Sequence, residues 1–295
     1  MEEFNKYKTY LEKKMNIFID SNFPSKVNEQ VKYMCADGKK LRGVLVLIFG
    51  KSELEEPTSE TSHLAILIEI LHSISLVLDD SPLMDNDDSR RNKPSFFKNY
   101  GVKYTFFYIY YCINKLLIDL ASLSKISSKL NFKHISSKLD NLINGQLLDI
   151  NNNIIPNKCD TANELYRELE LLNGESFSKP KKWILIDNIR LNIYKTGSLF
   201  SLAIDLPQDL HGQKLSLSDN WSLLFGLLFQ YSDDYLDLEQ DIANDKPNIC
   251  KILDKLIIKR IIENGCNKLE IDIEKIDINK VAIKYILDKI RSRVC

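Results

Sequence analysis

The sequence predicts an all-α fold in a single domain. Glycine and proline are scarce, at 10 and 8 of 295 residues. Sheet-rich and Rossmann-like proteins of this size need many tight turns, which these two residues supply, whereas helical proteins do not. Apolar residues recur at the helical spacing of three and four along most of the chain, and we find no strand-like alternation, internal repeat or flexible linker. We therefore expect one all-helical domain over residues 1–295.

The expected helices follow one another with few breaks. Thr61 and Ser62 would cap a long apolar helix. Pro82 and Pro94 enclose a polar stretch that lies outside any helix. Surface loops are expected at 151–160 and 179–182. Helices are expected at 1–34 (one or two), 39–50, 63–80, 104–123, 140–150, 161–172, 183–205, 216–241, 251–265 and 277–290.

Charge and cysteine content exclude several classes of protein. The chain has 40 basic and 41 acidic residues, whereas a general nucleic-acid binder needs a basic excess. Its six scattered cysteines lack metal-binding spacing, and its first residues lack the apolar core of a signal peptide. The most apolar run, 104–113, is about half of the ~20 residues that a membrane span needs. We expect a cytoplasmic protein with no membrane span and no nucleic-acid partner.

A cluster of carboxylates closes the long apolar helix. Asp79, Asp80 and Asp85 follow the run LAILIEILHSISLVL. Carboxylates at the negative end of a helix dipole are unfavourable unless cations compensate them, so a solvated helix end explains this cluster poorly. An ideal helix would put Asp79 and Asp85 on different faces. Pro82 ends or kinks the helix, which lets Asp85 return toward Asp79.

A second cluster follows another apolar run, WSLLFGLLFQ. Asp233 and Asp237 are four residues apart, so both project from one helix face. Mg²⁺ prefers oxygen ligands, usually one or two carboxylates together with waters and substrate phosphates. Two such clusters on separate helices would clamp a diphosphate through several Mg²⁺ ions.

Basic residues indicate a site for a second diphosphate. In the segment GKKLR, Gly38 precedes Lys39 and Arg42, and a backbone amide with two cations would hold an anionic group. His72 lies seven residues before Asp79, close to the same helix face. A lone histidine on an apolar helix is more often a core residue, but its alignment with Asp79 favours a functional role.

Taken in order, these motifs resemble those of the trans-type isoprenyl diphosphate synthases, the polyprenyl synthetase family. The resemblance covers nearly the whole chain. Each block by itself is a weak signal, whereas five in the family's order are a strong one. The matching blocks are GKKLR from Gly38, DDSPLMD from Asp79 with Arg90 and Arg91 after it, GQLLD from Gly145, KTG from Lys195, and FQYSDDYLD from Phe229.

The resemblance implies an antiparallel helical bundle around a deep central cavity, usually as a homodimer, with about three Mg²⁺ ions bound. The implied metal ligands are Asp79, Asp80, Asp85, Asp233 and Asp237. The implied contacts to the allylic diphosphate are Arg90, Lys195, Gln230 and Lys246. The implied contacts to isopentenyl diphosphate are Gly38, Lys39, Arg42, His72 and Arg91.

The implied reaction joins isopentenyl diphosphate to dimethylallyl, geranyl or farnesyl diphosphate. The allylic C–O bond ionises because metal and cationic groups stabilise the leaving diphosphate. The isopentenyl double bond then attacks the allylic cation, and a proton is lost. Thr196 and Gln230 would stabilise the cation with oxygen dipoles. The other residues of the implied catalytic set are Asp79, Asp80, Asp85, Arg90, Lys195 and Asp233.

Several positions depart from the family pattern. Asp37 and Asn92 stand where the family has glycines, Lys40 replaces an arginine, and Gly43 replaces a proline. The segment after the second cluster offers one lysine, Lys246, where the family usually has two. These departures leave the implied metal ligands intact, so they bear on rate and pocket shape more than on the type of reaction.

Product length in this family depends on the residues just before the first aspartate, which are Ile74 and Ser75 here. Neither is aromatic, and Ser75 lies one turn, about 6 Å, below Asp79. This favours a C20 geranylgeranyl product, with C15 farnesyl next. The aromatic stretch 104–111 would instead shorten the product if it filled the pocket from a neighbouring helix.

Two other functions remain open. A terpene synthase uses the same fold and metal chemistry on one diphosphate, and it would not need the cations of a second diphosphate site. A non-catalytic partner subunit of another prenyl synthase could lose one aspartate cluster, whereas this chain keeps both.

Overall fold

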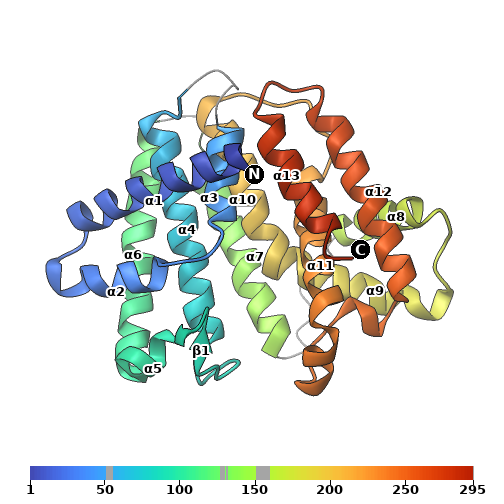
Figure 1. Ribbon diagram of the computed structural model, residues 1–295, viewed down its shortest axis with the longest axis horizontal. Helices are drawn as coiled ribbons and strands as arrows, with labels where there is room; N and C mark the ends of the chain where they lie inside the picture. Colours follow the sequence, from blue (N-terminus) through green and yellow to red (C-terminus); the bar gives the residue numbers. More distant parts are fainter. Residues whose placement is uncertain (51–55, 127–129, 131, 151–159, 295) are drawn as a thin grey trace. The chain divides into compact units, whose positions relative to one another are not determined.

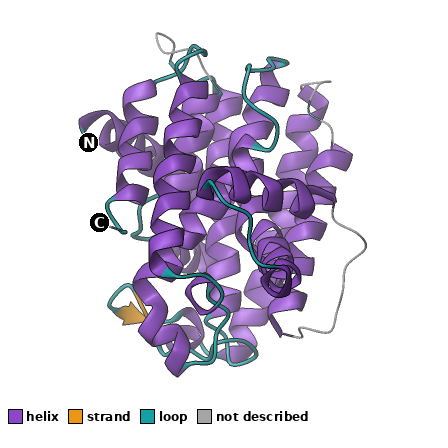
Figure 2. Cartoon of the chain, turned by 90° about the vertical axis from the view of Figure 1, so that its right-hand side faces the viewer, coloured by secondary structure: helices purple, strands orange, loops and turns teal. Residues whose placement is uncertain are grey.

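The computed structural model describes residues 1–50, 56–126, 130, 132–150 and 160–294, and helix is nearly their only regular structure (Figures 1 and 2). The all-α prediction is confirmed. The chain divides into two compact units. Unit 1 comprises Met1–Lys133 with Ala203–Lys214, and unit 2 comprises His134–Leu202 with Leu215–Cys295. The expectations of one domain and of a central cavity stay predictions.

Unit 1 is arranged around helix α4 (Ser59–Asp79), which packs against α1, α2, α3 and α6 (Figure 1). Thr58, and not Thr61 or Ser62, caps this helix, since its hydroxyl oxygen accepts a hydrogen bond from the Thr61 amide at 3.1 Å. Most α4 side chains from Leu64 to Val77 are buried. The other elements of unit 1 are α1 (Glu2–Asn22), α2 (Ser25–Cys35), α3 (Leu41–Phe49), β1 (Ser89–Arg90), β2 (Lys93–Pro94), α5 (Phe96–Tyr100) and α6 (Val102–Ile126).

Unit 2 is arranged around helix α11 (Trp221–Ala243), which packs against α9, α12, α13 and two short helical turns, η1 and η2. All its side chains from Trp221 to Leu228 are buried. The other elements are α7 (Phe132–Ile150), α8 (Asp160–Asn173), α9 (Lys179–Asn192), η1 (Ile193–Gly197), η2 (Ile249–Lys251), α12 (Lys255–Ile273) and α13 (Lys280–Arg291), while α10 (Ser198–His211) runs from unit 2 into unit 1.

One local expectation was wrong, and two segments contain features that helical periodicity did not predict. The segment 179–182 is the first turn of α9, with Pro180 at its start, because proline is pre-organised for a helix N-terminus. The helix expected over 183–205 contains a π-helical turn, η1, between α9 and α10. The polar stretch before Pro94 contains a small antiparallel strand pair. The expected loop at 151–160 lies outside the described residues except for Asp160, the first residue of α8.

The strand pair is closed by a two-residue turn, Arg91-Asn92, in which both residues have left-handed backbone conformations, with φ of 53° and 62°. This is the backbone pattern of a type I′ hairpin turn. Asparagine is one of the few residues other than glycine that adopt it readily. Asn92 therefore preserves the conformation that the family's glycine would provide.

Two helices, α4 and α6, are long and apolar enough to cross a membrane by length and composition. In α4, 72% of the apolar window is buried inside the protein, as in the core helix of a folded unit, whereas in α6 the buried share is 39%. The apolar run found at 104–113 is therefore part of a longer apolar helix with one face exposed.

Candidate active site

The first aspartate motif lies where α4 ends. Asp79 is the last residue of the helix, and the following loop turns back on it. The backbone N–H of Asp85 donates to the Asp79 carbonyl at 2.9 Å, and that of Asp87 donates to the Asp80 carbonyl at 3.1 Å. These bonds satisfy carbonyls that a helix end otherwise leaves without partners. The backbone of Asp85 thus returns to Asp79, as expected from Pro82.

Asp80 has a cationic partner within the protein. Its side chain is 3% exposed and lies against Arg90, whose Nε is 2.7 and 2.6 Å from the two carboxylate oxygens and whose Nη2 is 2.5 Å from Oδ1. Burial raises the pKa of Asp80, and this contact with a guanidinium opposes the rise. Asp80 is therefore paired with Arg90 in the structure. The role of Asp80 as a metal ligand and that of Arg90 as a diphosphate contact stay predictions. Asp79 and Asp85 are the other predicted ligands of this motif.

Cationic residues surround His72 on α4. Arg42 Nη1 donates to His72 Nε2 at 3.1 Å. An arginine can only donate, so Nε2 must accept and the ring proton lies on Nδ1. Burial lowers the pKa of His72 well below its usual value, and Arg42, Arg91, Lys40 and Arg90 lower it further. His72 is therefore neutral, in a region of positive charge that suits an anionic ligand.

The predicted isopentenyl diphosphate residues gather in the same part of unit 1. Gly38 has a φ of 81°, and a Cβ there would lie 2.6 Å from the guanidinium carbon of Arg91, so only glycine allows this approach. Arg91 also donates to the carbonyl of Ala36 at 3.0 Å. Lys39 is exposed beside them. Asp37 keeps a left-handed φ of 59° where the family has glycine.

A small pocket of about 50 Å³ opens next to this region within unit 1. It has room for a few water molecules. Charged side chains line much of it, among them Arg90, Arg91, Lys93, Asp37 and Asp80. Ile74 and Ser75, our predicted chain-length residues, do not line this pocket; Ile74 is buried and the Ser75 hydroxyl donates to the His72 carbonyl at 2.8 Å.

The second aspartate motif lies on α11, where the helix emerges from the core of unit 2. Asp233 is partly exposed and Asp237 is exposed, whereas Asp234 between them is buried. Burial and the nearby Asp241 raise the pKa of Asp237, and Arg293 opposes the rise. Asp233 and Asp237 remain the predicted ligands. Lys246 lies beyond the end of α11, with its backbone N–H donating to the Asp241 carbonyl at 2.9 Å.

A chain of hydrogen bonds fixes Thr196 and Gln230. The Thr196 hydroxyl donates to Gln230 Oε1 at 2.8 Å, and Gln230 Nε2 donates to Asp234 Oδ1 at 2.8 Å. The other carboxylate oxygen of Asp234 accepts from the Ile249 amide at 3.0 Å. Because an ionised carboxylate can only accept, it determines which way the Gln230 amide points. The Gln230 oxygen is thus occupied by Thr196, and the lone pairs of the Thr196 oxygen face away from that bond.

The π-helical turn η1 carries Lys195 and Thr196, and two glycines hold it. A Cβ at Gly145 on α7 would lie 2.5 Å from the Lys195 nitrogen, and one at Gly226 on α11 would lie 2.9 Å from the Gly197 Cα. Gly145 of the GQLLD block therefore lets the backbones of α7 and η1 approach each other closely. The side chain of Asp149 in this block lies outside the described residues. Sequence reasoning missed Gly226 and the role of Asp234, although both lie within or beside the motifs.

The carboxylates fit Mg²⁺ as part of a metal–diphosphate complex. Within the part of the chain that the structure describes, no group of three or more histidine, cysteine or acidic side chains could hold a metal ion by itself. The predicted ligands instead come from two motifs, Asp79, Asp80 and Asp85 in the first and Asp233 and Asp237 in the second. Mg²⁺ usually takes one or two carboxylates when phosphates and waters complete its shell.

The neutral state of His72 predicts a pH dependence of stability. Below about pH 6.5 the unfolded chain protonates this histidine while the folded protein keeps it neutral, so unfolding becomes easier as the pH falls. When the pH is lowered from about 7.5 to about 5.5, the unfolding free energy should fall in both proteins. In urea titrations we expect the fall to be about 1 kcal/mol smaller for His72→Gln than for the wild type. Equal losses in the two proteins would contradict a neutral His72.

The hydrogen-bond chain predicts that Asp234 contributes to stability. Asp234→Asn would present an NH₂ group to one of two donors, the Gln230 amide or the Ile249 N–H. At about pH 8, above the Asp234 pKa of about 6, we expect a loss of about 1–3 kcal/mol of unfolding free energy in urea titrations. Asp233→Asn is the matched control and should lose less, since its carboxylate is partly exposed. Equal losses would contradict this role of Asp234.

Comparisons with known proteins agree with the motifs. The profile of the polyprenyl synthetase family matches residues 24–251. A farnesyl diphosphate synthase of Buchnera aphidicola is 30% identical over 233 residues, which cover 77% of this chain and 76% of that protein. A geranylgeranyl pyrophosphate synthase of Penicillium janthinellum is 28% identical over 209 residues, and the match spans 49% of its length.

The fold agrees as well. The geranylgeranyl pyrophosphate synthetase from the archaeon Geoglobus acetivorans aligns over 98% of this chain and 99% of its own, with a TM-score of 0.72 and 18% identity. At that identity the likeness concerns the fold alone. The family match over most of the chain, together with the relative at 30% identity, shows that this chain belongs to the polyprenyl synthetase family, whose members are prenyltransferases.

Proposed function

We propose that this protein is a Mg²⁺-dependent short-chain prenyltransferase that condenses isopentenyl diphosphate with an allylic diphosphate. The observation that carries the proposal is the combination of two carboxylate groups, one at the end of α4 and one on α11, with a separate cluster of cations around a neutral His72. The carboxylates suit a metal-bound diphosphate. The cations suit a second diphosphate that needs no metal.

The residues divide into three roles. Asp79, Asp80, Asp85, Asp233 and Asp237 would bind Mg²⁺, which when bound would neutralise charge on the departing allylic diphosphate. Arg90, Lys195, Gln230 and Lys246 would contact the same diphosphate. Isopentenyl diphosphate would be held by the unit 1 group: Gly38, Lys39, Arg42, His72 and Arg91.

Thr196 would stabilise the allylic cation. Its hydroxyl hydrogen is directed to Gln230, so its oxygen lone pairs are the part of the group that can face positive charge. The orientation is fixed before substrate binds, because Asp234 holds the Gln230 amide. Attack by the isopentenyl double bond would form the new C–C bond and leave the positive charge on the isopentenyl unit. Loss of a proton from the adjacent carbon to the departing diphosphate would then form the new double bond.

The cations around His72 favour this function over a terpene synthase. A synthase that cyclises one diphosphate would gain nothing from a second anion site, whereas a cluster of cations suits a second diphosphate. A non-catalytic partner subunit is disfavoured by the retention of both aspartate motifs. For product length we propose C20, with C15 as the alternative, since neither Ile74 nor Ser75 is a bulky aromatic residue.

We also propose that the protein is a homodimer that uses one face of α6. Aromatic and aliphatic side chains recur there at helical spacing and are exposed, with Phe107 78% and Tyr110 70% exposed. A large apolar surface of this kind is typical of a protein interface. These exposed side chains also argue against the alternative in which residues 104–111 fill the product pocket. The face consists of Tyr104, Phe107, Tyr110, Tyr111, Leu117 and Ile118.

The first test is product formation. We expect the purified protein with Mg²⁺, farnesyl diphosphate and labelled isopentenyl diphosphate to form a labelled C20 diphosphate, measured by chromatography. Asp79→Ala and Asp233→Ala should each lower the rate about a hundredfold or more, since each removes a ligand of the Mg²⁺ that would neutralise the leaving diphosphate. Asp140→Ala, an exposed carboxylate outside both motifs, is the control.

The other outcomes separate the alternatives. Label that enters only with a shorter allylic primer would move the product to C15 or below. Conversion of farnesyl diphosphate to hydrocarbon without incorporation of isopentenyl label would identify a terpene synthase. No reaction with any primer would support the hypothesis of a non-catalytic partner subunit instead.

The dimer is tested by mass in solution. Sedimentation equilibrium should give twice the 34.2 kDa of one chain. A double change, Phe107→Glu with Tyr110→Glu, should give a folded monomer, because charges on this face would repel and remain solvated. Ile17→Glu replaces an exposed apolar residue on α1 and should leave the dimer intact. A dimer that persists in the double variant would place the interface elsewhere.

A further inference from the structure

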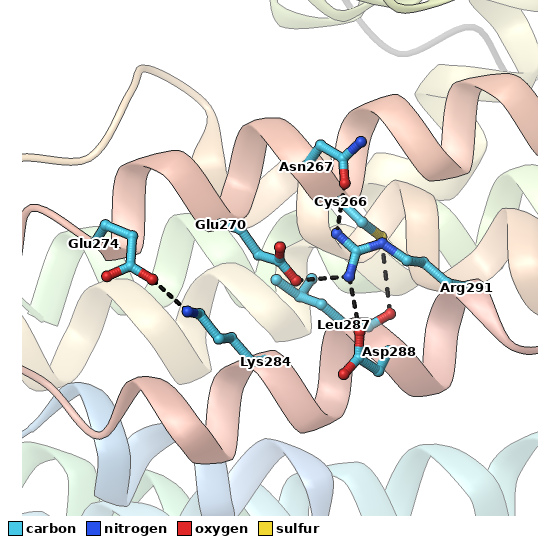
Figure 3. Close-up of polar contacts among 8 residues, drawn as sticks. All are labelled: Cys266, Asn267, Glu270, Glu274, Lys284, Leu287, Asp288 and Arg291. Carbon is cyan, nitrogen blue, oxygen red and sulfur yellow. Dashed lines mark hydrogen bonds and ion pairs between the residues drawn. The ribbon is translucent and has the colours of Figure 1, made fainter.

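The C-terminal segment of the chain is firmly anchored within unit 2. Arg291, at the end of α13, donates to Glu270 at 2.6 Å, to Asp288 at 2.8 Å and, through its other amino group, to Asn267 at 2.8 Å (Figure 3). Lys284 pairs with Glu274 on the same two helices. Beyond the helix, Val294 is buried. Ser292 and Arg293 are thus held between two fixed points, Arg291 and Val294.

Arg293 lies against the second aspartate motif. Its Nη1 is 2.9 Å from Asp233 Oδ1 and donates to the Ser232 hydroxyl oxygen at 2.8 Å. The Ser232 hydroxyl in turn donates to the Phe229 carbonyl, so it can only accept from the arginine. The guanidinium carbon also lies 4.7 Å from the centre of the Phe229 ring, a favourable cation–π distance.

These contacts hold the Arg293 guanidinium against one face of α11. Phe229, Ser232 and Asp233 are related by helical spacings of three and four, and Asp237 continues the same face. The Arg293 side chain is 14% exposed and that of Asp233 is 32% exposed, so water screens the pair only in part. The proposed metal ligand Asp233 therefore already has a cationic partner in the protein itself.

A guanidinium and Mg²⁺ on the same carboxylate repel each other. A carboxylate has enough lone pairs for both, but two positive groups within a few ångströms raise the free energy of the doubly bound state. Displacement of the Arg293 side chain costs an ion pair, a hydrogen bond and a cation–π contact.

We propose that Arg293 is a counter-ion built into the second aspartate motif, which holds Asp233 in the metal-free protein and yields it when Mg²⁺ binds. The proposal rests on the proposed function, because that function makes Asp233 a metal ligand. Arg293 is thus a positioning residue: it keeps Asp233 ordered and neutralised without metal, and it sets how much Mg²⁺ the motif requires.

The test measures Mg²⁺ binding without any diphosphate. MgCl₂ is titrated into the wild type and Arg293→Gln by calorimetry, and melting temperatures are recorded at each concentration. We expect the variant to bind Mg²⁺ about three- to tenfold more tightly, since removal of a partly buried competing ion pair has about this effect. The variant should be the less stable protein without Mg²⁺ and should gain more from its addition.

Two variants make the result specific. Lys284→Gln removes the same charge from α13 in a pair outside the motif, and its Mg²⁺ affinity should match the wild type. Arg293→Lys keeps the charge but loses planar contacts with Asp233 and Phe229, and it should lie between the wild type and Arg293→Gln. If Arg293→Gln does not fold, Arg293→Lys compared with the wild type still decides the direction of the effect.

Several results would overturn the proposal. Equal or weaker Mg²⁺ binding by Arg293→Gln would mean that Arg293 remains in place beside the metal or supports it. If neither protein binds Mg²⁺ measurably while the wild type forms product, the counter-ion role is rejected and the proposed function stands. Failure of the wild type to form product would reject the proposed function, whatever Mg²⁺ binding Arg293→Gln shows.

Discussion

Burial of α4 and α11 along their apolar lengths limits where charged chemistry can lie in this protein. Each is the central helix of its unit, and an ionised carboxylate inside such a core would cost several kcal/mol. The aspartate motifs therefore begin where the apolar runs end, after Val77 on α4 and after Leu228 on α11. Glu69, inside the apolar run of α4, is buried and accepts a hydrogen bond from the Gly43 amide. Both motifs then need positive partners, and each contains an arginine–aspartate pair: Arg90 with Asp80, and Arg293 with Asp233. In both motifs the paired aspartate is one of the predicted ligands.

Close packing of backbones positions the uncharged part of the site. The turn η1 departs from α-helical geometry at Ile193–Gly197, and π-helical turns of this kind occur frequently at functional sites. Gly145 and Gly226 let α7 and α11 approach it to distances that any Cβ would forbid. Thr196 is thereby brought to Gln230, and the buried Asp234 fixes the amide. Backbone packing thus determines the direction of a single hydroxyl group.

The departures from the family pattern have structural explanations at three positions. Asp37 and Asn92 keep left-handed backbone conformations that glycine would adopt, and aspartate and asparagine tolerate them better than other side chains. Gly43 has a backbone N–H that proline would lack, and it donates this hydrogen to the buried Glu69 at 2.8 Å. The changes thus preserve the local geometry or satisfy a buried carboxylate.

The sequence by itself determined the helical class and the order of the motifs, because helical periodicity and motif spacing are local properties of the chain. It also predicted that Pro82 returns Asp85 to Asp79, which is a local backbone effect. It could not determine the Thr58 cap, the π-helical turn or the partners of Asp80 and Asp234, since these depend on which donors lie nearby after folding. Arg293 shows the limit most clearly: nothing in its neighbourhood in the sequence points to Asp233. Only the packing of α13 in unit 2 brings this guanidinium to the carboxylate, because tertiary contacts between distant residues leave no periodic signal in the chain.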